Sequence, residues 1–219
     1  MEMDDEGGEE IDAPVHSPTH HTAGVDFESQ DRIELDVTRN FERLDQAFQI
    51  FEGVMVPEGG YGNTEWSLNL RTAGQRAVSG RLDLSHGGFW TGTRSQLRGE
   101  LTVQPAPGMS LSGEYRRNEV ELSDGEFETN LARLPGDWNP TPRQSLSSRV
   151  QYDDVSGVLG LFVRAQWILS PGNDIHLVSS HAWSNEAERL FDRHLHTMAQ
   201  GAAIKVNYTW RLELPGSTG

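Results

Sequence analysis

The strongest constraint on the fold is a two-residue alternation of apolar and polar side chains that begins near residue 31 and continues almost to the C-terminus. It is clearest over residues 158–169 and 204–212, where apolar residues occupy every second position. Successive side chains of a β-strand point to opposite faces of a sheet, so this period predicts strands with one apolar face. Helical spacing is nearly absent. The one candidate, residues 185–198, favours a loop with a single helical turn.

Segments of this kind recur about ten times, with turn residues where the alternation breaks. The stretch Pro171-Gly172-Asn173-Asp174 is the strongest tight-turn signal. Longer connections are expected at 42–61, 86–93, 135–143 and 184–200, and the pattern lacks the helices of about 10–15 residues that parallel strands require. The fold class predicted is therefore all-β, an antiparallel up-and-down meander of about ten long strands.

Charge and composition exclude several classes of protein. Among 219 residues, 33 are acidic and 18 are basic, and there is no cysteine. An acidic chain is a poor nucleic-acid binder, because phosphate contacts need clustered Lys and Arg. Without cysteine there are no disulfides and no thiolate ligands. The chain also has no apolar stretch long enough for a membrane helix.

The chain divides into three parts on composition. Residues 1–24 carry many carboxylates and few apolar side chains, which predicts a disordered acidic leader. Residues 25–212 are predicted to form the β domain, and residues 213–219 a C-terminal tail.

The alternation alone does not say what covers the apolar face. A soluble barrel or sandwich turns its apolar residues inward, whereas an outer-membrane barrel turns them toward lipid. Three features favour the membrane: the strands are long, aromatic residues lie near strand ends, and the polar face carries charges of both signs. The aromatic residues expected at the membrane interface are Trp66, Tyr152, Trp167, Trp183, Tyr208 and Trp210. The charges expected to face the lumen are Arg71, Arg98, Glu100, Glu114, Arg116, Arg149, Arg164 and Lys205.

Outer-membrane barrels have short periplasmic turns and longer extracellular loops. Counting back from a periplasmic C-terminus places 184–200, 153–157, 118–125, 86–93 and 42–61 outside. It places 171–174, 135–143, 105–108 and 73–75 inside. Segment 135–143 is longer than expected for an inside turn. A periplasmic leader would require an even number of strands.

Three stretches are distinctive, namely SLSSRVQYD at 145–153, RAQWILSPGNDIHLV at 164–178 and KVNYTW at 205–210. They resemble the C-terminal part of a bacterial family of outer-membrane-associated β-barrel proteins of unknown function. Shorter matches occur upstream, namely FESQD at 27–31, GFWTGTR at 88–94 and NEVEL at 118–122. The resemblance implies an all-β barrel in the outer membrane of a Gram-negative bacterium and no established reaction.

Members of that family usually carry a secretion signal and an N-terminal module similar to family-9 carbohydrate-binding domains. The resemblance therefore implies that this chain is a C-terminal fragment of a longer protein or a truncated reading frame, and that any carbohydrate would be bound by the missing module. In addition, nine residues follow Trp210, whereas terminal strands of such barrels usually finish on an aromatic residue.

The function expected is an outer-membrane β-barrel, or part of one, that anchors a larger envelope protein or forms its pore, without catalysis of its own. Its expected partners are outer-membrane lipid and the barrel-insertion machinery. The alternative is a soluble antiparallel barrel or sandwich that binds a small ligand or a glycan.

Other constellations have simpler explanations. His194 and His196, with Asp192 nearby, could form a metal pair, but no third ligand is fixed by spacing and a polar loop explains them. The histidines of the leader, His16, His20 and His21, would bind metal only adventitiously. No cofactor motif and no metal site are therefore predicted.

Glu100 and Glu114 are expected to be cross-strand neighbours on the polar face, where they could supply the paired carboxylates of a glycosidase. Charge compensation of Arg98 and Arg116 explains them better. The arginines of the polar face could give a pore an anion preference, or they could fill the lumen with salt bridges.

Overall fold

The computed structural model describes residues 18–185 and 195–210. The described chain is built of strands. Their bounds are β1 (Thr19–Asp26), β2 (Arg32–Leu44), β3 (Phe48–Phe51), β4 (Val54–Val56), β5 (Gly59–Arg71), β6 (Val78–Phe89), β7 (Gly92–Ala106), β8 (Met109–Leu122), β9 (Gly125–Thr141), β10 (Gln144–Asp153), β11 (Val158–Ser170), β12 (Asn173–Asn185) and β13 (Leu195–Asn207). The predicted all-β class is confirmed. Within these residues, no helix has the length and hydrophobicity required to cross a bilayer.

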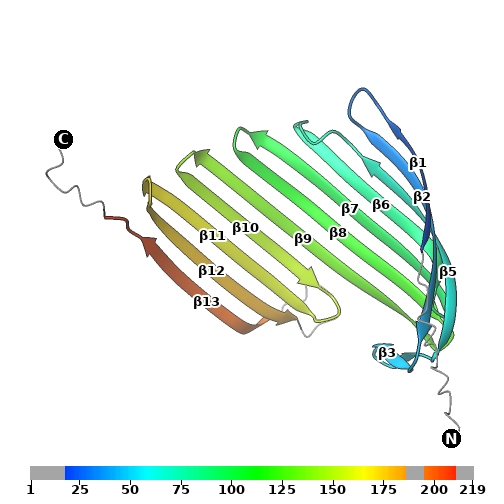
Figure 1. The fold of residues 1–219 in the computed structure, drawn as a ribbon. Coiled ribbons are helices and arrows are strands. Elements are labelled where there is room, and N and C mark those ends of the chain that lie inside the picture. The colour runs from blue at the N-terminus through cyan, green and yellow to red at the C-terminus, as the bar shows by residue number, and fades with distance from the viewer. Residues whose placement is uncertain (1–17, 186–194, 211–219) are drawn as a thin grey trace, which may run out of the picture.

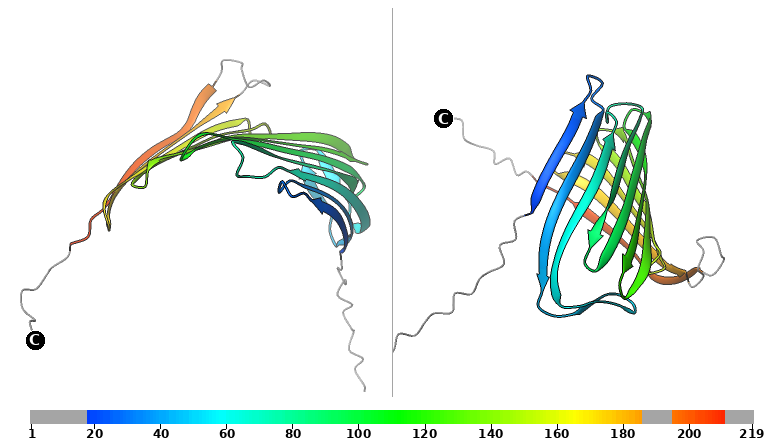
Figure 2. Two further views of the ribbon diagram at one scale, coloured as in Figure 1. Left: turned by 90° about the horizontal axis from the view of Figure 1, so that it is seen from above. Right: turned by 90° about the vertical axis from the view of Figure 1, so that its right-hand side faces the viewer.

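Eleven strands form one antiparallel sheet in the order β1-β2-β5-β6-β7-β8-β9-β10-β11-β12-β13. Each strand pairs with its sequence neighbours, apart from the β3–β4 hairpin inserted between β2 and β5, so the predicted meander is confirmed with one strand more than expected (Figure 1). The sheet curves into an open trough, and β1 and β13 lie at its two edges (Figure 2). In the described part of the chain, these two edge strands pair only with β2 and β12.

Tight turns set the register between neighbouring strands. Pro107-Gly108 and Pro171-Gly172 each join two strands, and both glycines have a positive φ, 74° and 86°. Proline fixes its own φ and glycine takes the left-handed conformation, which suits a two-residue connection. A Cβ on Gly108 would lie 2.4 Å from the carbonyl oxygen of Asn139, so this position also requires glycine for space. The tight turn predicted at residue 171 is therefore present.

The two ends of the sheet differ. We call the end at which the β3–β4 hairpin lies the hairpin end and the other the opposite end (Figure 1). Among the connections that the structure describes, those expected outside the membrane lie at the hairpin end and those expected inside lie at the opposite end. Segment 135–143 is not a loop, because β9 continues through Pro135 to Thr141 and only two residues form the turn.

Three expectations about the chain ends and the strand count are corrected. β1 begins at Thr19 and pairs with β2, so residues 19–24 are a strand and not part of a disordered leader. Residues 195–198 belong to β13 and form no helical turn. An odd number of strands also carries β1 and β13 in the same direction, so Thr19 lies toward the hairpin end and Asn207 at the opposite end. The remainder of the leader, residues 186–194 and the predicted tail at 213–219 lie outside the described residues.

A small apolar cluster lies between the β3–β4 hairpin and the sheet. Val54 and Val56 are buried, and Phe51 of the hairpin stacks on Phe127 of β9 with ring centroids 4.5 Å apart. Trp90, in the β6–β7 turn, packs edge-on against Phe48. The hairpin within the long connection is thus held against the sheet by aromatic packing.

Candidate functional site

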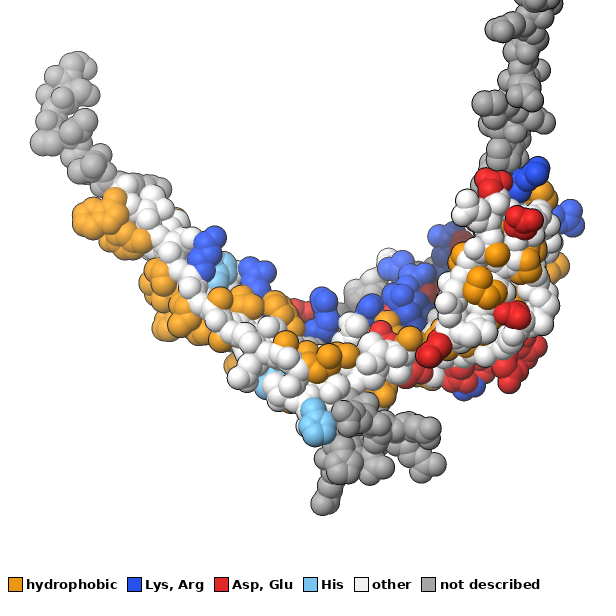
Figure 3. Space-filling view, turned by 90° about the horizontal axis from the view of Figure 1, so that it is seen from below, with side chains coloured by type: hydrophobic (Ala, Val, Ile, Leu, Met, Phe, Trp, Pro, Cys, Tyr) orange, Lys and Arg blue, Asp and Glu red, His pale blue; other side chains and the backbone are white. Residues whose placement is uncertain are grey.

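The two faces of the curved sheet differ in chemistry. Residues paired directly across an antiparallel ladder share a face, so the register assigns every strand position to one side. Leu35, Leu68, Leu84 and Leu97 form one such row across β2, β5, β6 and β7. Basic side chains line the inner side of the trough, and apolar side chains gather on the outer side of its C-terminal half (Figure 3). We refer to these as the concave and convex faces.

The convex face is apolar and exposed. Leu101, Leu134 and Ile204 have 55%, 59% and 69% of their surface accessible. Within the described residues, only four apolar side chains are buried, and none of them belongs to the middle of this face. The sheet is a single layer, so nothing in the described chain packs against its convex side. A covering medium or partner is required, because apolar surface of this extent in water is unfavourable.

Aromatic residues lie at both edges of the convex apolar band. Toward the hairpin end, the next residue on this face beyond Trp66 is the polar Thr64, and the next beyond Tyr115 is the charged Arg117. Tyr152 of β10 and Trp183 of β12 occupy the same edge. Each of them lies directly opposite Leu159 of β11, the strand between them.

At the opposite end the edge is formed by Trp138 and Trp167, with 48% and 53% of their surfaces exposed. Tyr208 and Trp210 follow β13 at this end and are 65% and 80% exposed. Trp138 and Tyr115 were missed by the sequence reasoning. Trp138 lies in the expected loop 135–143, which contains three prolines, although Leu134, Gly136 and Trp138 continue the alternation.

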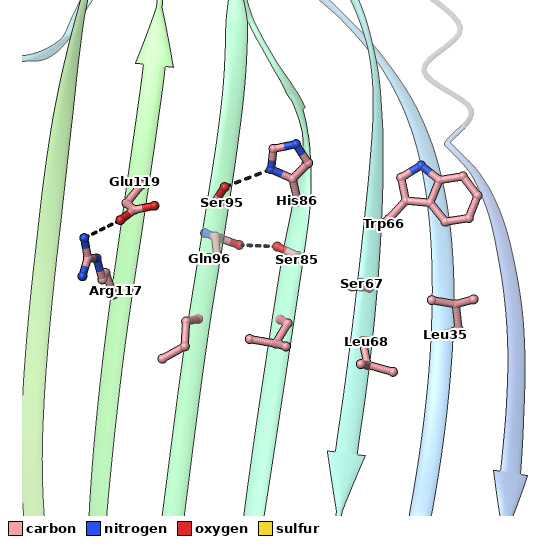
Figure 4. A pocket seen from close by; sticks show the side chains of 12 residues that line it. Leu35, Trp66, Ser67, Leu68, Ser85, His86, Ser95, Gln96, Arg117 and Glu119 are labelled. Atoms are coloured by element: carbon pink, nitrogen blue, oxygen red, sulfur yellow. Dashed lines mark hydrogen bonds and ion pairs between the residues drawn. The ribbon is translucent and has the colours of Figure 1, made fainter.

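Figure 4 shows the hairpin-end edge of the band at close range. A shallow hollow of roughly 490 Å³ has Leu35 and Leu68 on one side and the polar pair Arg117–Glu119 on the other. His86 Nδ1 and Ser95 Oγ lie 2.9 Å apart between them. The hollow therefore marks the boundary at which this face changes from apolar to polar.

The eight charges expected on the polar face share the concave face. Direct cross-strand pairs connect Arg98 with Arg116, Glu100 with Glu114, and Lys205 with His176. The register of the remaining strands puts Arg71, Arg149 and Arg164 on the same side.

Glu114 is the centre of the densest charge cluster on the concave face. Its side chain is 13% exposed, and its carboxylate lies 2.5 Å from Arg116 and 3.0 Å from Arg98. Arg133 approaches within 3.7 Å from the neighbouring strand. The expected pairing of Glu100 with Glu114 is present, and both carboxylates face arginines, which is the arrangement of a charge-compensating pair.

Acidic side chains on β2 and β5 are also engaged. The carboxylate of Asp36 is 8% exposed and accepts hydrogen bonds from Thr22 and Asn69. His20 lies 3.3 Å from it, so this histidine interacts with a carboxylate of the sheet. Glu65 pairs with Arg94 at 2.9 Å. Among the described residues, no group of three metal-ligating side chains converges. His16, Asp192 and His194 lie outside those residues.

A polar network at the opposite end joins two turns. Asp31 accepts hydrogen bonds from Ser29 Oγ at 2.8 Å, from Arg76 at 2.9 Å and from the backbone N–H of Ala73 at 3.0 Å. These contacts connect the β1–β2 turn to the β5–β6 turn. The hydrogen bond from Ser29, followed by that from Arg76, lowers the pKa of the Asp31 carboxyl below its ordinary value.

Asp31→Asn should make the unfolding of the sheet less sensitive to acid. A carboxyl whose pKa is lowered by folding stabilises the protein above its unfolded-state pKa of about 3.9, and the contribution is lost as pH falls through the folded-state value. The difference in unfolding free energy between wild type and variant should therefore shrink on acidification. Denaturant titrations from about pH 6 to about pH 2 would measure it. Glu28→Gln, in the same turn, is the control, and a difference independent of pH would contradict the prediction.

Comparison with known proteins adds little to this description. No family model matches the chain, and no curated protein matches it. A solved structure to which it is similar is that of the NanC porin in a rhombohedral crystal form. The identity is 10%, the match covers 88% of this chain and 93% of the porin chain, and the TM-score is 0.35. A likeness of this size carries no conclusion about function, and the association with a carbohydrate-binding family receives no support.

Proposed function

We propose that the chain forms all or part of the wall of an outer-membrane β-barrel. This barrel would serve as the membrane anchor or the pore of a larger envelope protein, without catalysis of its own. The observation that carries this proposal is the distribution of side chains between the faces. Between its aromatic edges the convex side carries apolar residues, whereas the concave side carries the Glu114 cluster and the other basic side chains.

This distribution is the reverse of that in a soluble barrel. A soluble barrel or sandwich that holds a ligand fills its interior with apolar side chains and presents charges to water. Here the concave interior holds Glu114 with its three arginines, and the convex exterior holds Leu134 and Ile204. A curved sheet with this polarity is stabilised when lipid covers the outside and water fills the inside.

The strand lengths and aromatic edges support the same role. β7 and β9 contain 15 and 17 residues. A strand of about 9–11 residues crosses the hydrocarbon layer when tilted, so these strands would extend beyond it. Aromatic side chains at both limits of the apolar band match the interfacial girdles of membrane barrels. In this role the partners are lipid and the insertion machinery, and carbohydrate would be handled by a separate module.

Single-cysteine labelling tests the proposal. Because the sequence contains no cysteine, each introduced thiol is the single thiol available to the reagent. Cysteines are placed one at a time along β11, at Leu161, Val163 and Ala165 on the convex face and at Phe162, Arg164 and Gln166 on the concave face. Full-length protein is inserted into phosphatidylcholine vesicles and treated with a water-soluble maleimide. The concave set is expected to react and the convex set to be protected, with a two-residue period.

The same cysteines can be labelled with an environment-sensitive fluorophore. Convex positions should then be quenched by brominated lipid chains, whereas concave positions should be quenched by iodide. Equal access of the maleimide to both sets in folded protein would overturn the membrane role. Protection by a protein partner instead of lipid would appear as convex shielding without quenching by brominated lipid.

A further inference from the structure

Seven consecutive strands each place one basic side chain at neighbouring positions on the concave face. We call this set the cationic row. Its members, from β7 to β13, are Arg98, Arg116, Arg133, Arg149, Arg164, His176 and Lys205.

The register makes the row continuous. Arg98 is directly opposite Arg116, and His176 is directly opposite Lys205. Each of the other steps is diagonal: Arg149, for example, is paired with Phe162, two residues before Arg164. Diagonal neighbours of an antiparallel pair are about 7–8 Å apart, so the basic side chains follow one another from strand to strand without a gap.

The row also stays level with the convex apolar band. Its diagonal steps move toward the opposite end of the sheet as the strand number rises. The aromatic edge moves in the same direction. Leu146 of β10 is paired with Trp138 on one side and with Ala165 on the other. Trp167 lies two residues beyond Ala165 on β11, closer to the opposite end. Strands of a barrel are tilted to its axis, so a set that follows this drift stays near one height of the barrel.

The two halves of the row differ in charge compensation. On β7 to β9, Arg98, Arg116 and Arg133 surround Glu114. On β10 to β13, Arg149, Arg164 and Lys205 are exposed and make no ion pair within the described residues.

Acids on the same face of this half are few or already engaged. Asp174 accepts hydrogen bonds from Asn207 and Gln166 and pairs with His176 at 2.8 Å. Asp137 and Asp153 lie on this face without an ion pair among the described residues, and Asp153 sits at the hairpin-end limit of β10. The middle of β10 to β13 therefore presents uncompensated positive charge to the concave side.

We propose that the cationic row is a recognition surface for solutes carrying several anionic oxygen groups, bound mainly through Arg149, Arg164 and Lys205. This rests on the proposed function in one respect, namely that water fills the concave side. Arginine and lysine bind phosphate and carboxylate oxygens through charge-assisted hydrogen bonds, and a series of such groups favours a ligand with several anionic groups over a simple anion. In a closed pore, the same row would select anions by charge.

The test is equilibrium dialysis of full-length protein, folded in a neutral detergent, against inositol hexakisphosphate, with uncharged myo-inositol as the ligand control. The variant Arg149→Gln/Arg164→Gln/Lys205→Gln removes three charges from the row. The matched control Arg39→Gln/Arg43→Gln/Arg143→Gln removes three exposed arginines that lie elsewhere, on β2 and in the β9–β10 turn. Circular dichroism and denaturant titration confirm that each protein is folded.

Binding of the hexakisphosphate, weakened by salt, is expected for wild type and for the control. The row variant should bind about tenfold more weakly or worse, because it loses three charge-assisted contacts to the ligand. No binding by folded wild type, or an equal loss in both variants, would overturn the inference. Because dialysis requires only folded protein, it is independent of the cysteine labelling: failure of the lipid test with intact anion binding would reject the membrane role alone.

Discussion

Leu134→Arg is expected to lower the free energy of unfolding of the lipid-inserted protein by about 2–4 kcal/mol. Leu134 lies in the middle of the convex band on β9, between Ala132 and Gly136, with 59% of its surface exposed. If this surface faces hydrocarbon, an arginine there must either lose its hydration or distort the bilayer around it. Urea titration of protein folded into vesicles, followed by tryptophan fluorescence, measures the change.

Ser110→Arg is the matched control on the other face. Ser110 lies on the concave side of β8, directly opposite Asp137, so a guanidinium there meets water and a carboxylate. Its effect should stay within about 0.5 kcal/mol, as for most solvent-facing substitutions. If the two arginines had equal effects, the convex face would not be in lipid.

The second large effect is expected from Glu114→Gln, which keeps the size of the side chain and removes its charge. Three arginines, Arg98, Arg116 and Arg133, would then lose the carboxylate they share in a nearly buried position. The three arginine side chains are only about one-third exposed, so losing their charged acceptor is costly, and we expect the free energy of unfolding to fall by about 2–3 kcal/mol. The same urea titration measures it.

Glu100→Gln removes the neighbouring carboxylate of the same cluster. Glu100 is 37% exposed on its side chain and lies 3.9 Å from Arg98, so its pair is weak and solvent-screened. A loss of about 0.5 kcal/mol or less is expected. Were the two variants equally destabilised, the central position of Glu114 would have no energetic meaning.

The strands and the assignment of residues to faces could be predicted from the sequence because both depend on a local period. The alternation around Leu35, Leu68 and Leu97 specifies which side chains share a face, whatever the neighbouring strand is. Turns were predictable at Pro171-Gly172 for the same reason, since proline and glycine act on their own backbone.

What failed depends on contacts between strands. β1 is a polar stretch whose strand conformation comes from pairing with β2, and residues such as His20 and Thr22 gave no local signal for it. β9 runs through Pro135, where proline was read as a break. The period assigns most members of the cationic row to one face, but their alignment into a row cannot be read along the chain, because it depends on the register of seven strands.

The odd strand count has a consequence for how the two edges can meet. β1 and β13 both run from the hairpin end to the opposite end, so joining them directly would create a parallel ladder in a sheet whose other pairs are antiparallel. Parallel pairing has slanted hydrogen bonds and is slightly less stable per residue. A fully antiparallel cylinder would instead need an odd number of additional strands between these edges, and those next to β1 and β13 would run from the opposite end to the hairpin end.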